Sequence, residues 1–313
     1  MSPKARFWTI ALGAGALSAV LYLTLTIGSL GAMVFAYVAQ LPLFLAGLSL
    51  GAGASAIAAG VAAVVMLARG GVAFAMIFAL LFLLPVVLLV RQALLARQTA
   101  DGATEWYPAG MLAGWLTGIG AALLGAGAVA MEFFGGLESL ARAVAGQFYD
   151  VMVSASAMKP SIADRASTVE RMSAFMPGTA IASLLCMTVV NGTLAQGVLQ
   201  RFGWNVRPAV DIAALDLPVH VVGAFGLALV AGILLPGDFG YLARNLAAVL
   251  LVGGLLAGLS VAHCAARRFG GKSWMLVLLY AAALILFWPV LVLAAIGLAE
   301  PFVGLKRRLA RQA

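Results

Sequence analysis

The chain has 313 residues, of which 64% are hydrophobic and only 10% are charged, and its mean hydropathy is +1.09. Because soluble domains carry about 25% charged residues, this composition excludes a soluble globular fold. The net charge of +8 does not indicate a nucleic-acid partner, since the 19 Lys and Arg lie between apolar runs and at the chain ends instead of forming one stripe. We expect an all-α, polytopic integral membrane bundle whose first partner is the lipid bilayer.

Apolar runs long enough to cross about 30 Å of hydrocarbon follow one another along most of the chain. The first follows Lys4 and Arg6 and could pass for a signal peptide, but more spans follow, so an uncleaved first helix is favoured. This pattern is typical of the inner (cytoplasmic) membrane of a bacterium. The candidate spans are 8–27, 30–49, 52–68, 72–95, 108–131, 174–198, 218–235, 242–266 and 274–299.

The distribution of basic residues favours eight crossings over nine, because Lys and Arg near span ends prefer the cytoplasm. Nine crossings place 9 of the 19 basic residues inside, which is no bias. If one early segment does not cross, both termini lie in the cytoplasm and the split becomes 12 against 7. The inside set is then Lys4, Arg6, Arg69, Arg142, Lys159, Arg165, Arg171, Arg244, Lys306, Arg307, Arg308 and Arg311.

The sequence divides into N-terminal transmembrane helices (1–131), an amphipathic connection outside the membrane (132–173), and C-terminal transmembrane helices with a basic tail (174–313). Within the connection, apolar residues recur at helical spacing, which predicts an amphipathic helix lying on the membrane or on the bundle. These residues are Leu137, Leu140, Val144, Phe148 and Val151. A second short helix is predicted from Ser161, with Ser161 or Asp164 as its cap.

Residues that could carry catalysis or bind a metal are sparse. Cys186 and Cys264 lie inside apolar segments without ligand spacing, which predicts no disulfide and no metal site. His220 and His263 are the only histidines, and both lie at predicted span ends. Phosphate loops, dinucleotide fingerprints and protease or hydrolase motifs are missing from the sequence. We therefore expect no enzyme activity and no cofactor.

Uncharged polar residues inside the predicted spans are the candidate ligand-binding residues. Such groups either contact a solute or bond to neighbouring helices, as membrane bundles commonly do. Asn191 and Gln196 are five residues apart on one predicted helix, so they share at best a broad face. The candidates are Gln40, Asn191, Gln196 and Asn245.

Small residues at four-residue spacing form stripes that allow helix backbones to approach closely. Gly254 with Gly258, and Ala11 with Gly15 and Ala19, are examples. The stripes indicate either packing within the chain or docking to another membrane subunit.

Most of the chain resembles the YybS-like family of bacterial membrane proteins, whose function is not established, and the resemblance is clearest in the C-terminal third. The resemblance lies in Leu217-Pro218, a helix near Asn245, Ala257-Gly258-Leu259-Ser260-Val261, and Gly297-Leu298 before the basic tail from Lys306. That family tends to have Gln before Gly-Leu-Ser, where this chain has Ala257, and Asp shortly after the last Gly-Leu, where it has Glu300.

The N-terminal third also resembles the substrate-binding S components of energy-coupling-factor transporters. The similarity lies in Leu41-Pro42-Leu43 and Leu50-Gly51-Ala52-Gly53. It implies a small-solute binder that depends on a separate ATPase core. We therefore expect a multi-pass membrane protein that binds or helps to transport a small solute, with a non-catalytic assembly or interaction partner of other membrane proteins as the alternative.

Overall fold

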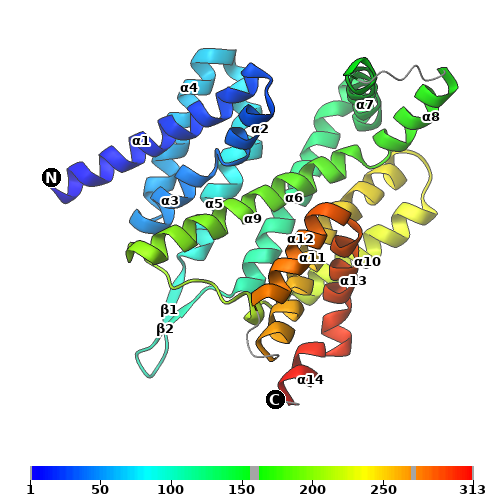
Figure 1. Ribbon diagram of the computed structural model, residues 1–313. Helices are drawn as coiled ribbons and strands as arrows, with labels where there is room; N and C mark the ends of the chain where they lie inside the picture. Colours follow the sequence, from blue (N-terminus) through cyan, green and yellow to red (C-terminus); the bar gives the residue numbers. More distant parts are fainter. Residues whose placement is uncertain (1, 156–161, 269–272, 312–313) are drawn as a thin grey trace. The chain divides into compact units, whose positions relative to one another are not determined.

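The computed structural model describes residues 2–155, 162–268 and 273–311, and it is almost entirely helical (Figure 1). The strands described are one short antiparallel hairpin, β1 (Ala96–Gln98) and β2 (Thr104–Trp106). The protein is thus an all-α membrane bundle, as its composition predicts. The helices are α1 (Pro3–Leu23), η1 (Thr24–Ile27), α2 (Leu30–Tyr37), α3 (Leu41–Leu50), α4 (Ala52–Phe78), η2 (Ala79–Leu83), α5 (Leu84–Ala93), α6 (Ala109–Met131), η3 (Glu132–Phe134), α7 (Gly136–Ala155), α8 (Ile162–Ser173), α9 (Met176–Phe202), η4 (Ile212–Ala214), α10 (Val219–Leu234), α11 (Gly237–Arg268), α12 (Ser273–Leu286), α13 (Trp288–Val303) and α14 (Leu305–Arg311).

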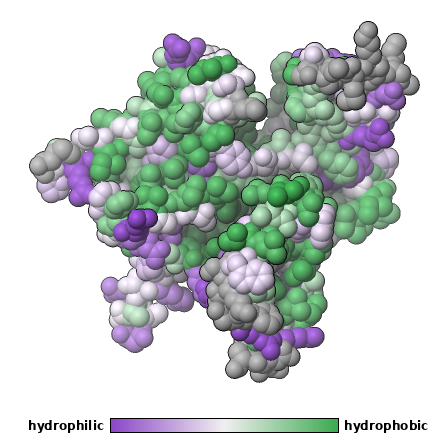
Figure 2. Space-filling view, in the orientation of Figure 1, coloured by the Kyte–Doolittle hydropathy of each residue, from purple (hydrophilic) through white to green (hydrophobic). Residues whose placement is uncertain are grey.

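By length and composition, six helical stretches among the described residues could cross a membrane, or seven if the bent pair α12–α13 counts as one. Many large apolar side chains on these stretches and on the shorter apolar helix α10 are exposed, including Ile27, Val129 and Leu227 at 71 to 73%. The face drawn in Figure 2 is correspondingly apolar over the helices, with hydrophilic residues gathered in patches. Lipid is the solvent that such a surface requires.

The chain forms two compact units, each with contributions from separate parts of the sequence. Unit 1 contains residues 1–116 and 184–211, and unit 2 contains residues 117–183 and 212–313. The boundaries fall within α6 and α9, so both helices contribute to each unit. Each unit is therefore completed by a segment distant in sequence from its main part.

In unit 1 the stretch 52–93 folds back on itself at Gly71. Gly71 has φ 77° and ψ −176°, the one non-helical residue within α4, and glycine adopts such a φ without a steric penalty. A Cβ built on Gly47 would lie 2.7 Å from Val90 and 2.8 Å from Ser55. A straight helix would separate Ser55 from Val90 by roughly 50 Å, so this stretch is two helices, as the expected spans 52–68 and 72–95 require.

One end of unit 1 gathers several segments. Ala11 of α1 packs with Ala46 of α3 and Ala54 of α4 in one buried cluster. The loop after α9 joins this end, because Val206 N–H donates to Leu48 O over 3.1 Å. The buried Arg207 donates to the carbonyls of Ala93 and Tyr107, over 2.8 Å each. The start of α1 and the ends of α3, α5 and α9 therefore lie together.

In unit 2, α11 and α13 pack with their backbones in contact. A Cβ on Gly258 would collide with the Leu293 carbonyl, and a Cβ on Gly297 would collide with the Gly254 carbonyl. For Gly254 and Gly258, the structure therefore favours packing within the chain over docking to another subunit.

The expected span 274–299 is divided into α12 and α13, which bend by 117° where they meet. Phe287 at the junction has φ 57°, and Pro289 follows at the start of α13. Proline has no N–H to donate to the carbonyl four residues earlier, and its ring clashes with that carbonyl in a helix. One continuous helix through this segment is thus prevented.

The amphipathic connection contains two helices, α7 and α8, as expected, although Ser161 lies outside the described residues. Ala145 and Tyr149 of α7 enclose a small core with Val169 of α8. Another face of α7 exposes apolar side chains at helical spacing, which suits a membrane surface. The exposed residues are Leu140, Val144, Phe148, Val151 and Met152.

We predict that α7 and α8 lie outside the hydrocarbon. In a chain whose native cysteines are replaced, Glu138→Cys and Asp164→Cys should react with a water-soluble maleimide in open membranes, because Asp164 is exposed and the Glu138 side chain is 38% exposed. Leu124→Cys in α6 should be protected, because Leu124 is 2% exposed. Complete protection of both connection positions would show that the segment is buried.

We predict that Gly258→Ala lowers the thermal stability of the detergent-solubilised protein. Its Cβ would collide with backbone of α13, and such overpacking costs about 1–3 kcal/mol. Gly226→Ala in α10 is the matched control, since a Cβ there meets nothing within 4 Å. Equal melting temperatures for the two variants would contradict the close packing of α11 on α13.

Candidate functional site

A break between α2 and α3 brings a polar side chain into the middle of an apolar span. Pro42 lacks an N–H and its ring excludes the helical position of the Val38 carbonyl, which instead accepts from Leu41 N–H over 3.0 Å. Residues 38–40 are therefore not helical. Gln40 lies in this break with 0% of its surface exposed.

A second irregular segment contacts the first. Residues 79–83 form a π-helical turn, two residues before Pro85, and a proline in a helix commonly displaces the preceding carbonyls in this way. Gln40 Nε2 donates to the carbonyl oxygen of Phe82 over 3.1 Å. The side chain in one break thus binds the backbone of the other, and π-turns are frequent at functional sites.

Asn191, which lies on the separate helix α9, donates a hydrogen bond to the α2–α3 segment. Its Nδ2 donates to the carbonyl of Tyr37, the last residue of α2, and to Met187 O in its own helix, both over 2.8 Å. The next residue, Gly192, lies against the ring of Phe44 in α3, where a Cβ would be 3.5 Å from the ring. Asn191 and Gly192 therefore contact the α2–α3 segment on both sides of Gln40.

Each of these two amides uses its donor group but not its acceptor. In the described part of the chain, Gln40 Oε1 and Asn191 Oδ1 accept no hydrogen bond, and neither do Ser18 Oγ and Ser55 Oγ. All four residues belong to unit 1 and are at most 1% exposed. Since a buried polar atom without a partner costs about 1–3 kcal/mol, four in one unit mark it as the candidate binding region.

The irregular segments lie near the middle of their spans. Gln40 is ten residues before the end of the stretch Gly31–Leu50, and Asn191 is eleven before the end of Met176–Phe202. The π-turn occupies the centre of the helical arm between Gly71 and Ala93. At 1.5 Å per residue these positions are about 15 Å from the span ends, which is the depth of the bilayer midplane.

The structure separates the four residues nominated from the sequence. Gln40 and Asn191 contact the same break, as described above. Gln196 is half-buried on α9, where its Oε1 accepts from Val210 N–H over 3.1 Å. Asn245 belongs to unit 2. The π-turn was missed by sequence analysis, although Pro85 within an apolar run could have indicated a distorted helix.

Asn245 has partners for its whole amide. Its Oδ1 accepts from Gly178 N–H over 2.8 Å, and its Nδ2 donates to Ala174 O and Tyr241 O. Gly178 is in the first turn of α9, where N–H groups have no partner within the helix. The geometry therefore indicates that Asn245 caps α9, while the expected contact with a ligand remains a prediction.

The recess between α7 and α8 is lined by charged side chains that bind one another. Arg165 donates two hydrogen bonds to Asp150, over 2.9 and 2.8 Å. Arg142, also in the lining, pairs with Glu138 beside the recess. The Arg165 guanidinium lowers the pKa of the Asp150 carboxyl through these bonds. Both pairs are exposed and add little stability. Across the described residues, no group of three His, Cys, Asp or Glu could hold a metal ion.

Comparison with known proteins places the chain in a family. A family model described as "Predicted membrane protein (DUF2232)" matches residues 16–299. The chain belongs to this family. No curated protein and no solved structure matches it. The DUF2232 match covers Gln40, the π-turn and Asn191, and it ends one residue before Glu300.

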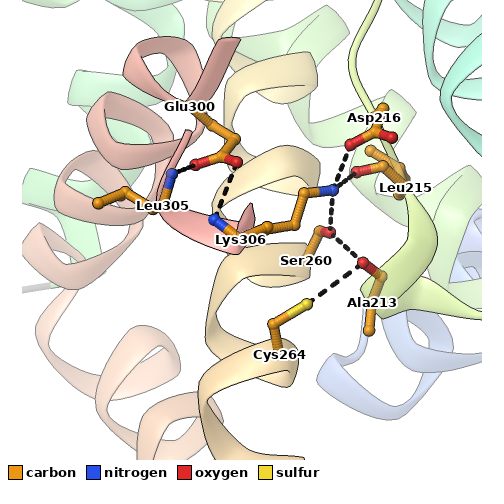
Figure 3. A network of polar contacts seen from close by, with 8 residues as sticks. All are labelled: Ala213, Leu215, Asp216, Ser260, Cys264, Glu300, Leu305 and Lys306. Atoms are coloured by element: carbon orange, nitrogen blue, oxygen red, sulfur yellow. Dashed lines mark hydrogen bonds and ion pairs between the residues drawn. The ribbon is translucent and has the colours of Figure 1, made fainter. Parts of the chain in front are cut away.

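A polar network joins the C-terminal helix, which follows the DUF2232 match, to residues within the match (Figure 3). Lys306 Nζ donates to Leu215 O over 2.7 Å and to Ser260 Oγ over 3.2 Å, and it pairs with Asp216. Glu300 accepts from the backbone N–H groups of Leu305 and Lys306. It therefore caps α14. Sequence analysis missed this network, although charged residues beside apolar spans were a signal for it.

We predict that Asn245→Leu destabilises the protein, because Gly178 N–H and Ala174 O lose their partner. Interhelical bonds of this kind contribute about 0.6 kcal/mol on average and up to about 1.7 kcal/mol in membranes. The melting temperature in mild detergent should therefore fall. Thr193→Val is the control, since Thr193 is exposed and bonds only to carbonyls of α9. A melting temperature equal to that of the control would contradict the capping role.

Proposed function

We propose that this multi-pass membrane protein binds a small solute within the bilayer and takes part in its transport, without catalysing a reaction. The observation that carries the proposal is the pair of buried amides at the α2–α3 break, whose carbonyl oxygens accept no hydrogen bond among the described residues. Solute sites need a few fixed polar groups in largely apolar surroundings. Gln40 and Asn191 are the residues we assign to this role.

Discontinuous helices at the midplane support this assignment. Membrane transporters commonly place substrate sites near the bilayer midplane, where a helix is interrupted and its backbone groups are freed. Here the break at residues 38–40 and the π-turn at 79–83 meet through Gln40. The donors of both amides are bound to backbone, so their free acceptors have fixed positions.

The resemblance of the N-terminal third to energy-coupling-factor S components is compatible with the same role, and it suggests a separate ATPase core as partner. The Leu41-Pro42-Leu43 motif that carries this resemblance is also the sequence that breaks the helix beside Gln40. We place the protein in the inner membrane of a bacterium, in keeping with the resemblance to the YybS-like family.

The proposal predicts that Gln40→Leu and Asn191→Leu abolish solute retention. The wild-type protein, purified in mild detergent and denatured, should release a small molecule in stoichiometric amount, detected by mass spectrometry. Each variant should lose it, while the melting temperature falls by only a few degrees, since one such bond contributes about 0.6 kcal/mol. Thr193→Val on the same helix should retain it.

Two results would contradict the proposal. One is an unchanged amount of the released molecule in Gln40→Leu and Asn191→Leu. The other is a wild-type protein that releases no molecule but copurifies with other membrane proteins, which would favour the assembly role instead.

A further inference from the structure

The last two apolar helices, α12 and α13, are too short to cross a membrane separately. They contain 14 and 16 residues, whereas a crossing needs roughly 20. They could cross only as one broken span, with the ends of the pair on opposite faces. The contacts of the pair with α11, all within unit 2, decide against this arrangement.

The start of the pair lies beside the end of α11. α12 begins five residues after Arg268, the last residue of α11. The His263 ring is 6.1 Å from the ring of Tyr280, in the middle of α12. α12 therefore runs back along α11, away from the end that carries Arg267 and Arg268.

The end of the pair returns toward the same end of α11. α13 packs on α11 at Gly254 and Gly258, close to the midpoint of that helix. Lys306, three residues after α13, then bonds to Ser260 over 3.2 Å. Ser260 is only about 12 Å from Arg268 along a helix roughly 48 Å long. The contacts that fix α12, α13 and α14 thus lie on the C-terminal half of α11.

We infer that α12 and α13 form a re-entrant hairpin, which enters one leaflet from the face carrying Arg268 and α14 and returns to that face. The apolar surface of this hairpin contacts the acyl chains of that leaflet. The bend between the helices exposes Leu284, Ile285 and Phe287 at 87, 80 and 68%. This apolar tip is suited to lipid, and a groove between the helices is lined by apolar side chains such as Leu278 and Val292.

Charge identifies the face as the cytoplasmic one. Six basic residues gather where the hairpin begins and ends: Arg267, Arg268, Lys306, Arg307, Arg308 and Arg311. Cations of this kind favour the cytoplasm and its anionic headgroups. The tip of the hairpin therefore contacts acyl chains, and the basic residues at its two ends lie beside anionic lipid headgroups.

With this pair not crossing, eight crossings remain: α1, the α2–α3 pair, the two arms that meet at Gly71, α6, α9, α10 and α11. α10 is counted although it has only 16 residues, because the segment that contains it extends along α11 from Ser260, which donates to Ala213 O over 3.0 Å, to Gly240, which lies beside Leu235 O. That distance along α11 is about 30 Å. Both termini then share one face, as expected from the sequence, but the segment that does not cross is the last one and not an early one. Of the 17 Lys and Arg in the described part of the chain, 12 belong to that face. They are Lys4, Arg6, Arg91, Arg97, Arg201, Arg207 and the six of the hairpin base.

The test uses single cysteines in a chain carrying Cys186→Ala and Cys264→Ser, labelled in whole cells with a membrane-impermeant maleimide. Arg268→Cys and Arg308→Cys flank the hairpin, and both should react only after the cells are permeabilised. Asp238→Cys, at the opposite end of α11, should react in intact cells and serves as the control. Labelling of Arg308→Cys from the same side as Asp238→Cys would overturn the inference, because the pair would then cross.

A second measurement tests the lipid contact itself. Phe287→Cys carries a bimane fluorophore, and the protein is reconstituted in vesicles of phosphatidylethanolamine and phosphatidylglycerol. Lipids spin-labelled along the acyl chain should quench the fluorophore more strongly than lipids labelled at the headgroup. Stronger quenching by headgroup labels, or by aqueous iodide, would place the tip in water and overturn the inference. Neither measurement depends on solute binding, so it can fail while the proposed function holds.

Discussion

The need to satisfy backbone hydrogen bonds without water constrains this fold more than any other factor. Pro42 and Pro85 each remove a backbone donor inside an apolar span, where lipid offers no replacement. Gln40 supplies a donor to Phe82 O, and Asn191 supplies one to Tyr37 O. Unit 1 therefore depends on two side-chain amides at the places where its helices are irregular.

The same amides link the architecture to the proposed activity. An amide that only repaired a helix would have both its ends satisfied, as Asn245 does in unit 2. Gln40 and Asn191 instead keep an acceptor oxygen, buried and held in place by the bond that the NH₂ group makes. The buried amides of the two units thus differ in whether the oxygen accepts a hydrogen bond.

The sequence was sufficient for the fold class and for most helix positions, because hydropathy reports directly on lipid exposure. It also predicted the two helices of the connection, since amphipathic spacing is a local property. It could not show that Asn191 contacts the break beside Gln40, because the two residues are distant in sequence. Nor could it show that Asn245 belongs to the other unit, or that Lys306 binds Ser260, since both facts depend on which helices are neighbours.

The assignment of α9 to unit 1 has a consequence for biosynthesis. The carbonyl of Tyr37 precedes its partner Asn191 by 154 residues, and translation at about 5–20 residues per second takes roughly 8–30 s to cover that distance. α1 to α5 are complete before this interval ends, but the α2–α3 break has not yet acquired its donor from α9. Until α9 has been made, the carbonyl of Tyr37 therefore lacks the side-chain donor that binds it in the folded protein. The rate of translation thereby sets the earliest time at which the candidate binding region can form.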